Sequence, residues 1–474
     1  MSAPRLVAGI DSSTQSVKVS IRDAATGEEV RSGRASHPAG SAVDPAHWWD
    51  ALMVAVRDAG GLDDVAALSV GAQQHGMVAL DASGTPVYPA LLWNDTRSAV
   101  DAEELVADRG ASWWCENTGS VPVASFTVTK LRWLSRAQPQ FAAAVTDVML
   151  PHDWLTWRLR GSPEGAATTD RGDASGTGYF SPARNEYLPD VVVDVLGHEA
   201  RLPEVLSATA SPGMTTGHDG LPSGILLGVG TGDNMAAALG VGAGPGDVVV
   251  SIGTSGTVFA STEKRTADPT GIVAGFADAA GGFLPLVCTL NASRVLDAAC
   301  SVLGVDYPEL DRLAQSVPDA EGLVLLPYLD GERTPNLPGA TGSLHGITRA
   351  NSTPEHFARA AVEGMLCGLA AGRQALASQG VACERVILIG GSAQSPVVAA
   401  IASSVLGVPV VVPQPGEYVA AGAARQAAWA LTGELPDWDA TSAPGTAAAQ
   451  VFAAEPRPDV LVRYQQVQSM AYPG

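Results

Sequence analysis

Lysine is almost missing from this sequence of 474 residues. Only Lys18, Lys130 and Lys264 occur, charged residues make up 16% of the chain, and the formal net charge is −21. Binding to the phosphates of a nucleic acid needs clustered lysine and arginine. The composition therefore argues against a nucleic-acid partner, and a phosphorylated ligand would have to be held by local hydrogen-bond donors and a metal ion.

Cysteine is scarce as well, with five residues and no Cys-x-x-Cys pair, so neither a disulfide scaffold nor a common zinc site is indicated. The apolar run before Asp11 is too short for a signal peptide. Residues 386–416 carry no formal charge, but four prolines interrupt them. They predict a buried strand, a helix and a second strand, not a membrane span. We expect a cytoplasmic protein without a membrane partner.

The familiar nucleotide and hydrolase motifs are also missing. None of the lysines follows a Walker A glycine pattern, and the protein-kinase sequences Asp-Phe-Gly and His-Arg-Asp do not occur. No serine lies in Gly-x-Ser-x-Gly, and the first strand and turn lack a Rossmann Gly-x-Gly-x-x-Gly. A nucleotide-binding function would need another arrangement.

Two segments about half a chain apart share one pattern. Residues 6–23 and 248–260 both read as strand, small polar turn and strand. A repeat of this length predicts two related domains that face one another, although polar turns between strands are common. Apolar strands alternate with Ala-rich helices throughout, which favours an α/β fold. The glycine-rich stretch 228–246 places the boundary, giving domains 1–244 and 245–474.

The two turns are candidate phosphate sites. The backbone N–H groups of Asp11–Thr14 and Gly253–Gly256 can cradle phosphate oxygens. The Asp11 carboxylate can also hold Mg²⁺ through water, because that ion keeps part of its hydration shell. An aspartate that merely caps an ordinary turn is the alternative. Matching turns in two domains could clamp a polyphosphate between them.

Two other motifs suggest ligand binding. Gly390–Ser395 follows an apolar strand, and a glycine turn there lets a flat ring such as adenine approach the backbone. A tight turn without a ligand explains this pattern equally well. Asp233 precedes an Ala-rich helix, where it could act as a general base or as the helix N-cap. Both interpretations of Asp233 remain open.

Polar side chains gather at the ends of two further expected strands. Residues Gln73–Gly76 and Trp93–Arg97 supply amides, an imidazole, a carboxylate and an aromatic ring. Such groups suit the hydroxyls of a sugar or polyol, with the ring as a wall. His75 by itself is more often a structural histidine. The two clusters are compatible with one site.

In this order and spacing, the motifs resemble the FGGY family of carbohydrate kinases. The matching segments span nearly the whole chain: Gly9–Thr14, Gln73–Asp81, Ala90–Arg97, Gly232–Asn234, Ser251–Gly256, Leu326–Pro335, Leu388–Ala393 and Glu417–Ala424. The resemblance implies an α/β fold of two actin-like domains, each built on a ribonuclease-H-like sheet, with an active-site cleft between them. It implies ATP and Mg²⁺ as cofactors, a sugar as substrate, and a homodimer.

The resemblance also assigns roles. Asp233 would be the catalytic base, and Asp11 and Asp233 would share Mg²⁺ largely through water. The phosphates and the nucleotide would be held by Asp11, Ser13, Thr14, Lys18, Gly253, Thr254, Gly391, Ser392 and Ala393. The sugar would contact Gln74, His75, Trp93, Asp233 and Asn234.

The sugar itself is indicated by His75. Family members that act on D-xylulose carry histidine there, whereas those that act on glycerol carry an Arg-Glu pair across the positions of Gln74 and His75. This favours the conversion of D-xylulose to D-xylulose 5-phosphate. Three positions depart from the pattern: Ser13 replaces a glycine, Gln74 replaces a methionine, and the adenosine motif has Ser392. The alternatives are another pentulose or a pentitol, such as ribulose, and a catalytically silent actin-like nucleotide-binding protein.

Overall fold

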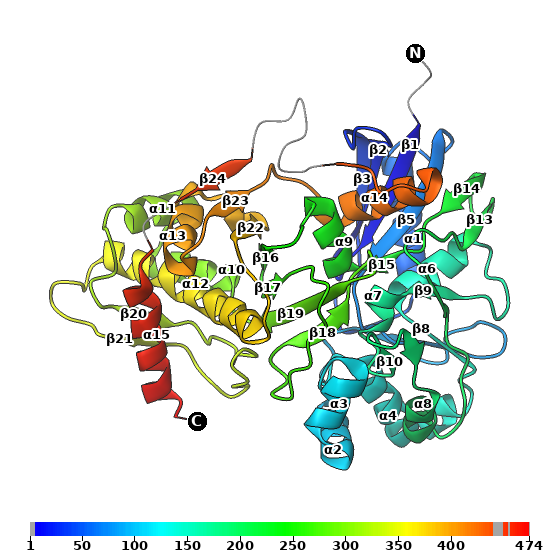
Figure 1. Cartoon of the computed structure of the whole chain (residues 1–474), viewed down its shortest axis with the longest axis horizontal. Coiled ribbons are helices and arrows are strands. Elements are labelled where there is room, and N and C mark those ends of the chain that lie inside the picture. The colour runs from blue at the N-terminus through cyan, green and yellow to red at the C-terminus, as the bar shows by residue number, and fades with distance from the viewer. Residues whose placement is uncertain (1–4, 439–448, 454–455, 474) are drawn as a thin grey trace. The chain divides into compact units, whose positions relative to one another are not determined.

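The computed structural model describes residues 5–438, 449–453 and 456–473, and these form two compact units (Figure 1). The first unit contains the described residues up to Gly242, the segment Glu263–Leu284 and the described residues from Gly416 to Trp438. The second contains Ala243–Thr262, Pro285–Pro415 and the described residues from 449 onward. Residues 432–449 are rich in Pro, Ala and Thr, which predicts a loop, and most of them, residues 439–448, lie outside the described residues.

The first unit is built on a mixed sheet. Its strand order is β13-β14-β5-β1-β2-β3. The bounds are β1 (Leu6–Ser12), β2 (Ser16–Asp23), β3 (Glu29–Ser36), β5 (Val65–Ala72), β13 (Gly213–Thr216) and β14 (Ser223–Leu227). The strand β1 is antiparallel to β2 and parallel to β5, and β5 is parallel to β14.

The apolar residues of β1 alternate between the two faces of this sheet, as the period of a strand requires. Ala8 and Ile10 pack with helix α1 (Ala46–Asp58) in one core cluster. Val7 packs on the other face, against Ala424 of helix α14 (Tyr418–Thr432). Helix α9 (Asp233–Val241) lies beside α14 (Figure 1). Both faces are therefore covered by helices.

The second unit repeats this sheet. Its strand order runs β19-β17-β16-β22-β23-β24. The bounds are β16 (Asp247–Ile252), β17 (Gly256–Phe259), β19 (Phe283–Thr289), β22 (Arg385–Ile389), β23 (Val410–Val412) and β24 (Gln450–Phe452). Here β16 pairs antiparallel with β17 and parallel with β22, β22 is parallel to β23, and β23 is antiparallel to β24. The same series of pairings joins β2, β1, β5, β14 and β13, so the repeat seen in the sequence is a repeat of topology.

Shorter strands and further helices complete both units. In the first unit these are β4 (Ala42–Val43), β6 (Val78–Leu80), β7 (Ala90–Leu91), α2 (Ala99–Arg109), α3 (Ala111–Thr118), α4 (Thr127–Ala137), α5 (Pro139–Ala142), β8 (Asp147–Met149), α6 (Pro151–Leu159), β9 (Thr168–Asp170), α7 (Arg171–Ala174), β10 (Phe180–Ser181), β11 (Glu186–Tyr187), α8 (Pro189–Leu196), β12 (Glu204–Leu206), β15 (Thr231–Gly232) and β18 (Ala274–Ala277). In the second they are α10 (Ser293–Leu303), α11 (Tyr307–Gln315), β20 (Val324–Leu326), β21 (Ser343–His345), α12 (Pro354–Ser378), the 3₁₀ turn η1 (Gly391–Gln394), α13 (Pro396–Leu406) and α15 (Pro458–Ala471).

The uncharged stretch 386–416 forms strand β22, helix α13 and strand β23, as its composition predicted. A search of the described residues finds no helix with both the length and the apolarity that a bilayer crossing requires. The last helix of the described residues is α15, which contains residues 460–470.

Candidate functional site

A buried carboxylate lies at the end of the strand that leads into the first hairpin turn. Asp11 is the next-to-last residue of β1, and its side chain accepts hydrogen bonds from Ser13 Oγ and from Lys18 Nζ, the latter at 3.3 Å. Lys18 Nζ also lies 2.6 Å from Glu417 Oε2, just before α14. Burial raises the pKa of Asp11, and the charge of Lys18 and the Ser13 hydroxyl only partly oppose it. A cation near Asp11 would favour its ionised form.

Asp233 opens the helix that the sequence predicted. The N-cap of α9 is Gly232, so Asp233 is the first helical residue and the alternative role as N-cap is wrong. Its Oδ1 accepts hydrogen bonds from Asn234 N at 2.8 Å and Asn234 Nδ2 at 2.9 Å. Burial, followed by the negative charge of Asp11, raises the pKa of Asp233 to about 7. Such a pKa suits a general base that works near neutral pH.

Asp233 is therefore expected to destabilise the protein above neutral pH. The folded pKa exceeds the ordinary value of 3.8, so the folded state holds more protons than the unfolded state between pH 4 and 7. Stability is lost as the pH rises through this window. Asp233→Asn keeps the Oδ1 acceptor and removes the charge. In Mg²⁺-free buffer we expect it to raise the melting temperature by a few degrees at pH 8, equivalent to about 4 kcal/mol.

The same substitution should have a smaller effect at pH 5, where Asp233 is already largely protonated in the folded state. Thermal unfolding of both proteins at the two pH values measures the difference. A melting temperature that does not rise at pH 8 would contradict the burial and the charge repulsion described above.

The loop after β5 carries the expected sugar-binding residues Gln74 and His75. Gln74 is 4% exposed, and its Nε2 donates to the Gly172 carbonyl at 2.9 Å. His75 Nδ1 lies 2.6 Å from the Gly176 carbonyl, so this nitrogen carries the hydrogen. The imidazole also packs against Phe126, with 4.7 Å between ring centroids. Both side chains are thus held by the segment that includes and follows α7.

The structure joins the second polar cluster to the first hairpin. Trp93 Nε1 donates to Thr14 Oγ1 at 2.7 Å. Asp95 is 3% exposed on its side chain and pairs with Arg97, with 2.7 Å from Nε to Oδ1. The residues Trp93 and Thr14, predicted separately for sugar and phosphate, are therefore direct neighbours.

The predicted nucleotide motifs of the second unit lie at the ends of adjacent strands. The turn with Gly253 and Thr254 joins β16 to β17, and Ser293 N donates to the Gly253 carbonyl at 2.9 Å. Gly390, with φ at +99°, follows β22, and a Cβ there would collide with the carbonyl of Ile252. Only glycine allows this close approach of two backbones.

The predicted adenosine residues follow that turn in η1. Gly391 is exposed, Ser392 is half-buried and Ala393 is buried. The second unit thus brings the two turns with their predicted phosphate and adenosine residues side by side, because β16 and β22 are neighbours in the sheet.

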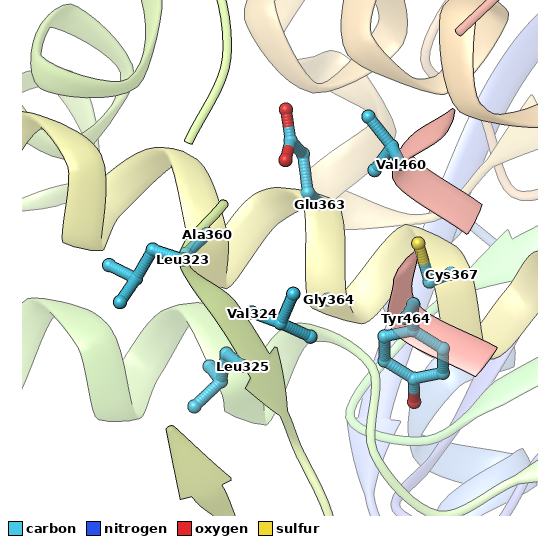
Figure 2. A pocket seen from close by; sticks show the side chains of 9 residues that line it. All are labelled: Leu323, Val324, Leu325, Ala360, Glu363, Gly364, Cys367, Val460 and Tyr464. Atoms are coloured by element: carbon cyan, nitrogen blue, oxygen red, sulfur yellow. The ribbon is translucent and has the colours of Figure 1, made fainter. Parts of the chain in front are cut away.

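A small cavity in the second unit lies elsewhere (Figure 2). It measures about 10 Å³ and is enclosed by strand β20 and helices α12 and α15. Glu363, Cys367 and Tyr464 contribute its polar atoms. This volume is about that of one water molecule, so neither a sugar nor a nucleotide fits.

Sequence reasoning missed a buried ionic network beside the segment that leads to Asp233. His152 Nδ1 lies 2.5 Å from Asp173 Oδ2, and both side chains are inaccessible to solvent. Asp170 accepts a hydrogen bond from Thr231 Oγ1 at 2.7 Å, two residues before Asp233. Burial opposes a charge on His152, but the carboxylates of Asp153, Asp173 and Asp170 outweigh it and raise its pKa to about 9.

His152, Asp153 and Asp173 are close enough to hold a metal ion, but a metal would have to displace the proton that the carboxylates favour on His152. We interpret the network as support for Gln74 and Thr231. Its only trace in the sequence is the occurrence of aspartates in the segments 151–153 and 170–173.

Asp11 and Asp233 are the groups that suit a hard cation. Both offer carboxylate oxygens, the donors that Mg²⁺ prefers, and the pKa of each is raised. The negative charge of Asp11 raises the pKa of Asp233, and a divalent cation would relieve this repulsion.

A repeated mixed sheet, with an acidic pair in one unit and glycine turns in the other, agrees with the carbohydrate-kinase fold that the motifs predicted. The model of the N-terminal domain of the FGGY family of carbohydrate kinases matches residues 6–240, and that of its C-terminal domain matches residues 248–431. The chain belongs to this family, which confirms the resemblance seen in the motifs.

Several known proteins align with this sequence over most of its length. It is 46% identical over 445 residues to a xylulose kinase of Streptomyces rubiginosus, covering 91% of this chain and 89% of the relative. It is 47% identical over 438 residues to a xylulose kinase of Streptomyces coelicolor, with 90% and 89% covered. The crystal structure of xylulose kinase from Bifidobacterium adolescentis aligns with a TM-score of 0.88 and 42% identity, covering 98% of this chain and all of that one.

Proposed function

We propose that the protein transfers the γ-phosphoryl group of ATP to the terminal hydroxyl of D-xylulose, giving D-xylulose 5-phosphate and ADP. The observation that carries this proposal is Asp233, a carboxylate with a pKa raised to about 7 at the first residue of α9. Membership of the family supports the reaction class, and the relatives named as xylulose kinases support the sugar. We also propose that residues 1–244 and 245–474 are its two family domains, that it acts in the cytoplasm, and that it forms a homodimer.

In the proposed mechanism, Asp233 takes the proton of the terminal hydroxyl as the hydroxyl oxygen attacks the γ-phosphorus. The bond from that phosphorus to the β–γ bridging oxygen breaks, and ADP leaves. Asn234 orients the base through two hydrogen bonds to Oδ1. Bound Mg²⁺ would neutralise phosphate charge, and Asp11 and Asp233 would hold it largely through water.

The remaining residues position the two substrates. We propose that Ser13, Thr14 and Lys18 contact the phosphates from the first hairpin. In the second unit, Gly253 and Thr254 would contact phosphate, and Gly391, Ser392 and Ala393 the adenosine. Positioning is the main source of catalysis in phosphoryl transfer, since the protein forms no covalent bond to the substrate.

The sugar assignment is tested with a coupled assay of ADP release. D-Xylulose, D-ribulose and the corresponding pentitols are compared by kcat/KM at saturating MgATP. We expect D-xylulose to give the highest value. A higher kcat/KM for another sugar would change the substrate assignment but not the assignment as a sugar kinase. The absence of sugar-dependent ADP release would favour a catalytically silent nucleotide-binding protein.

Gln74 offers a further test of the sugar site. Because its Nε2 bonds to the Gly172 carbonyl, the group left for a sugar hydroxyl is Oε1. One neutral hydrogen bond contributes about 1 kcal/mol, so Gln74→Met is expected to lower kcat/KM for D-xylulose three- to tenfold. The KM for ATP should not change. Unchanged kcat/KM in a less stable variant would mean that Gln74 only supports the loop.

A further inference from the structure

Lys130, one of only three lysines in the chain, is fully buried. It lies on α4, among the largest side chains with almost no solvent contact. Burying an ammonium group is costly, and buried charges are normally paired with a carboxylate. In the part of the chain that the structure describes, no carboxylate forms an ion pair with Lys130. Methionine or leucine would fill the same space at lower cost.

The amine of Lys130 donates hydrogen bonds to backbone carbonyl groups. Nζ lies 2.9 Å from the His75 carbonyl oxygen and 2.6 Å from the Ser125 carbonyl oxygen. Thr127, one turn earlier on α4, directs its Oγ1 to the same His75 carbonyl at 3.2 Å. Two side chains of helix α4 therefore donate hydrogen bonds to the same carbonyl group, in the loop after β5.

That peptide group belongs to a residue in an unfavourable conformation. His75 has φ at +69°, the left-handed region that residues with a Cβ seldom occupy. Such a conformation costs on the order of 1–3 kcal/mol and persists only when surrounding contacts enforce it. A change of φ at His75 would also turn the imidazole away from Gly176 and Phe126.

We propose that Lys130 is a positioning residue for the sugar site, which holds the His75 backbone in the left-handed conformation that aims the imidazole at the sugar. The proposal rests on the proposed function, because it assumes that His75 contacts the sugar. Lys130 itself touches neither substrate. Its effect must therefore pass through His75, and this dependence can be measured.

The experiment is a double-mutant cycle of Lys130→Met and His75→Asn. Methionine keeps the length of the side chain and removes the donors, and asparagine tolerates a positive φ. We expect Lys130→Met to raise the KM for D-xylulose about tenfold and to leave the KM for ATP within twofold. In the His75→Asn background the same change should have less than a twofold effect, because the group it positions is gone.

A purely structural lysine would give a different result. The effects of the two substitutions would then multiply, or kcat and both KM values would change together, and either outcome would overturn the proposal. Lys264→Met, at an exposed position, is the matched control and should leave both KM values unchanged. If Lys130→Met does not fold, Thr127→Val removes the weaker donor and should raise the sugar KM about threefold, again only when His75 is present.

Failure of the proposed function is recognised separately. The wild-type protein is assayed first with the panel of sugars, and the cycle uses the sugar with the highest kcat/KM. If that sugar is not D-xylulose, the substrate assignment fails while the coupling between Lys130 and His75 is still tested.

Discussion

Asp233→Asn is expected to lower kcat for the sugar by about 10³-fold, within the range of roughly 10²–10⁴ that a positioned general base supplies. The asparagine keeps the Oδ1 acceptor for Asn234 and so keeps the start of α9 intact. It cannot take a proton from the attacking hydroxyl. The KM for ATP should change little, because Asp11 remains to hold Mg²⁺ and the predicted phosphate and adenosine residues lie in other segments. Steady-state kinetics with the coupled ADP assay measures both quantities.

The interpretation requires that the variant is folded and still binds nucleotide. Its melting temperature should equal or exceed that of the wild type, for the electrostatic reason given above, and calorimetry should give a similar Kd for ATP. Asp50→Asn, at an exposed position on α1, is the control for a generic loss of an acidic side chain. More than a tenth of wild-type turnover in Asp233→Asn would exclude Asp233 as the base.

The sequence was sufficient to predict the parts of the site that are local in the chain. The turn of residues 13–15, the glycine turn after β22 and the helix that starts at Asp233 all lie within a few residues of their predicted places. These features depend on strand period and on turn residues, which short windows reveal. The duplication was visible for the same reason, since its two hairpins have the same pattern.

Long-range contacts could not be predicted in the same way. Nothing around Lys130 indicates that its amine meets a carbonyl 55 residues earlier, and nothing near His152 indicates Asp173 as its partner. The left-handed conformation of His75 could not be predicted either, because residues other than glycine seldom adopt a positive φ. Such contacts follow from the packing of distant segments, which periodicity within one segment does not specify.

The contact between helices α9 and α14 is one of these long-range features. A Cβ on Gly422 would overlap the carbonyl oxygen of Ala236, and a Cβ on Gly240 would overlap that of Tyr418. The two helices thus touch through their backbones (Figure 1). The residue before α14, Glu417, bonds to Lys18, so α14 connects the helix of Asp233 with the partner of Asp11. The glycines therefore fix how closely α9, which begins with Asp233, approaches α14.

Gly422→Ala is expected to destabilise the protein by about 3 kcal/mol or more. Overpacking usually costs 1–3 kcal/mol, and the atoms in the way here belong to backbone, which cannot move aside as a flexible side chain can. The gain in helix propensity from glycine to alanine, about 1 kcal/mol, is too small to compensate. Thermal unfolding should show a melting temperature several degrees below that of the wild type, and the fraction that folds should turn over sugar more slowly because α9 is displaced.

Gly368→Ala is the matched control, since Gly368 lies inside helix α12 with no atom within 4 Å of an added Cβ. There the propensity gain is unopposed, so the melting temperature should stay the same or rise. The same chemical change should thus have opposite signs at the two sites. Equal melting temperatures for the two variants would show that α9 and α14 can separate without cost, and that backbone contact between them does not fix the position of Asp233.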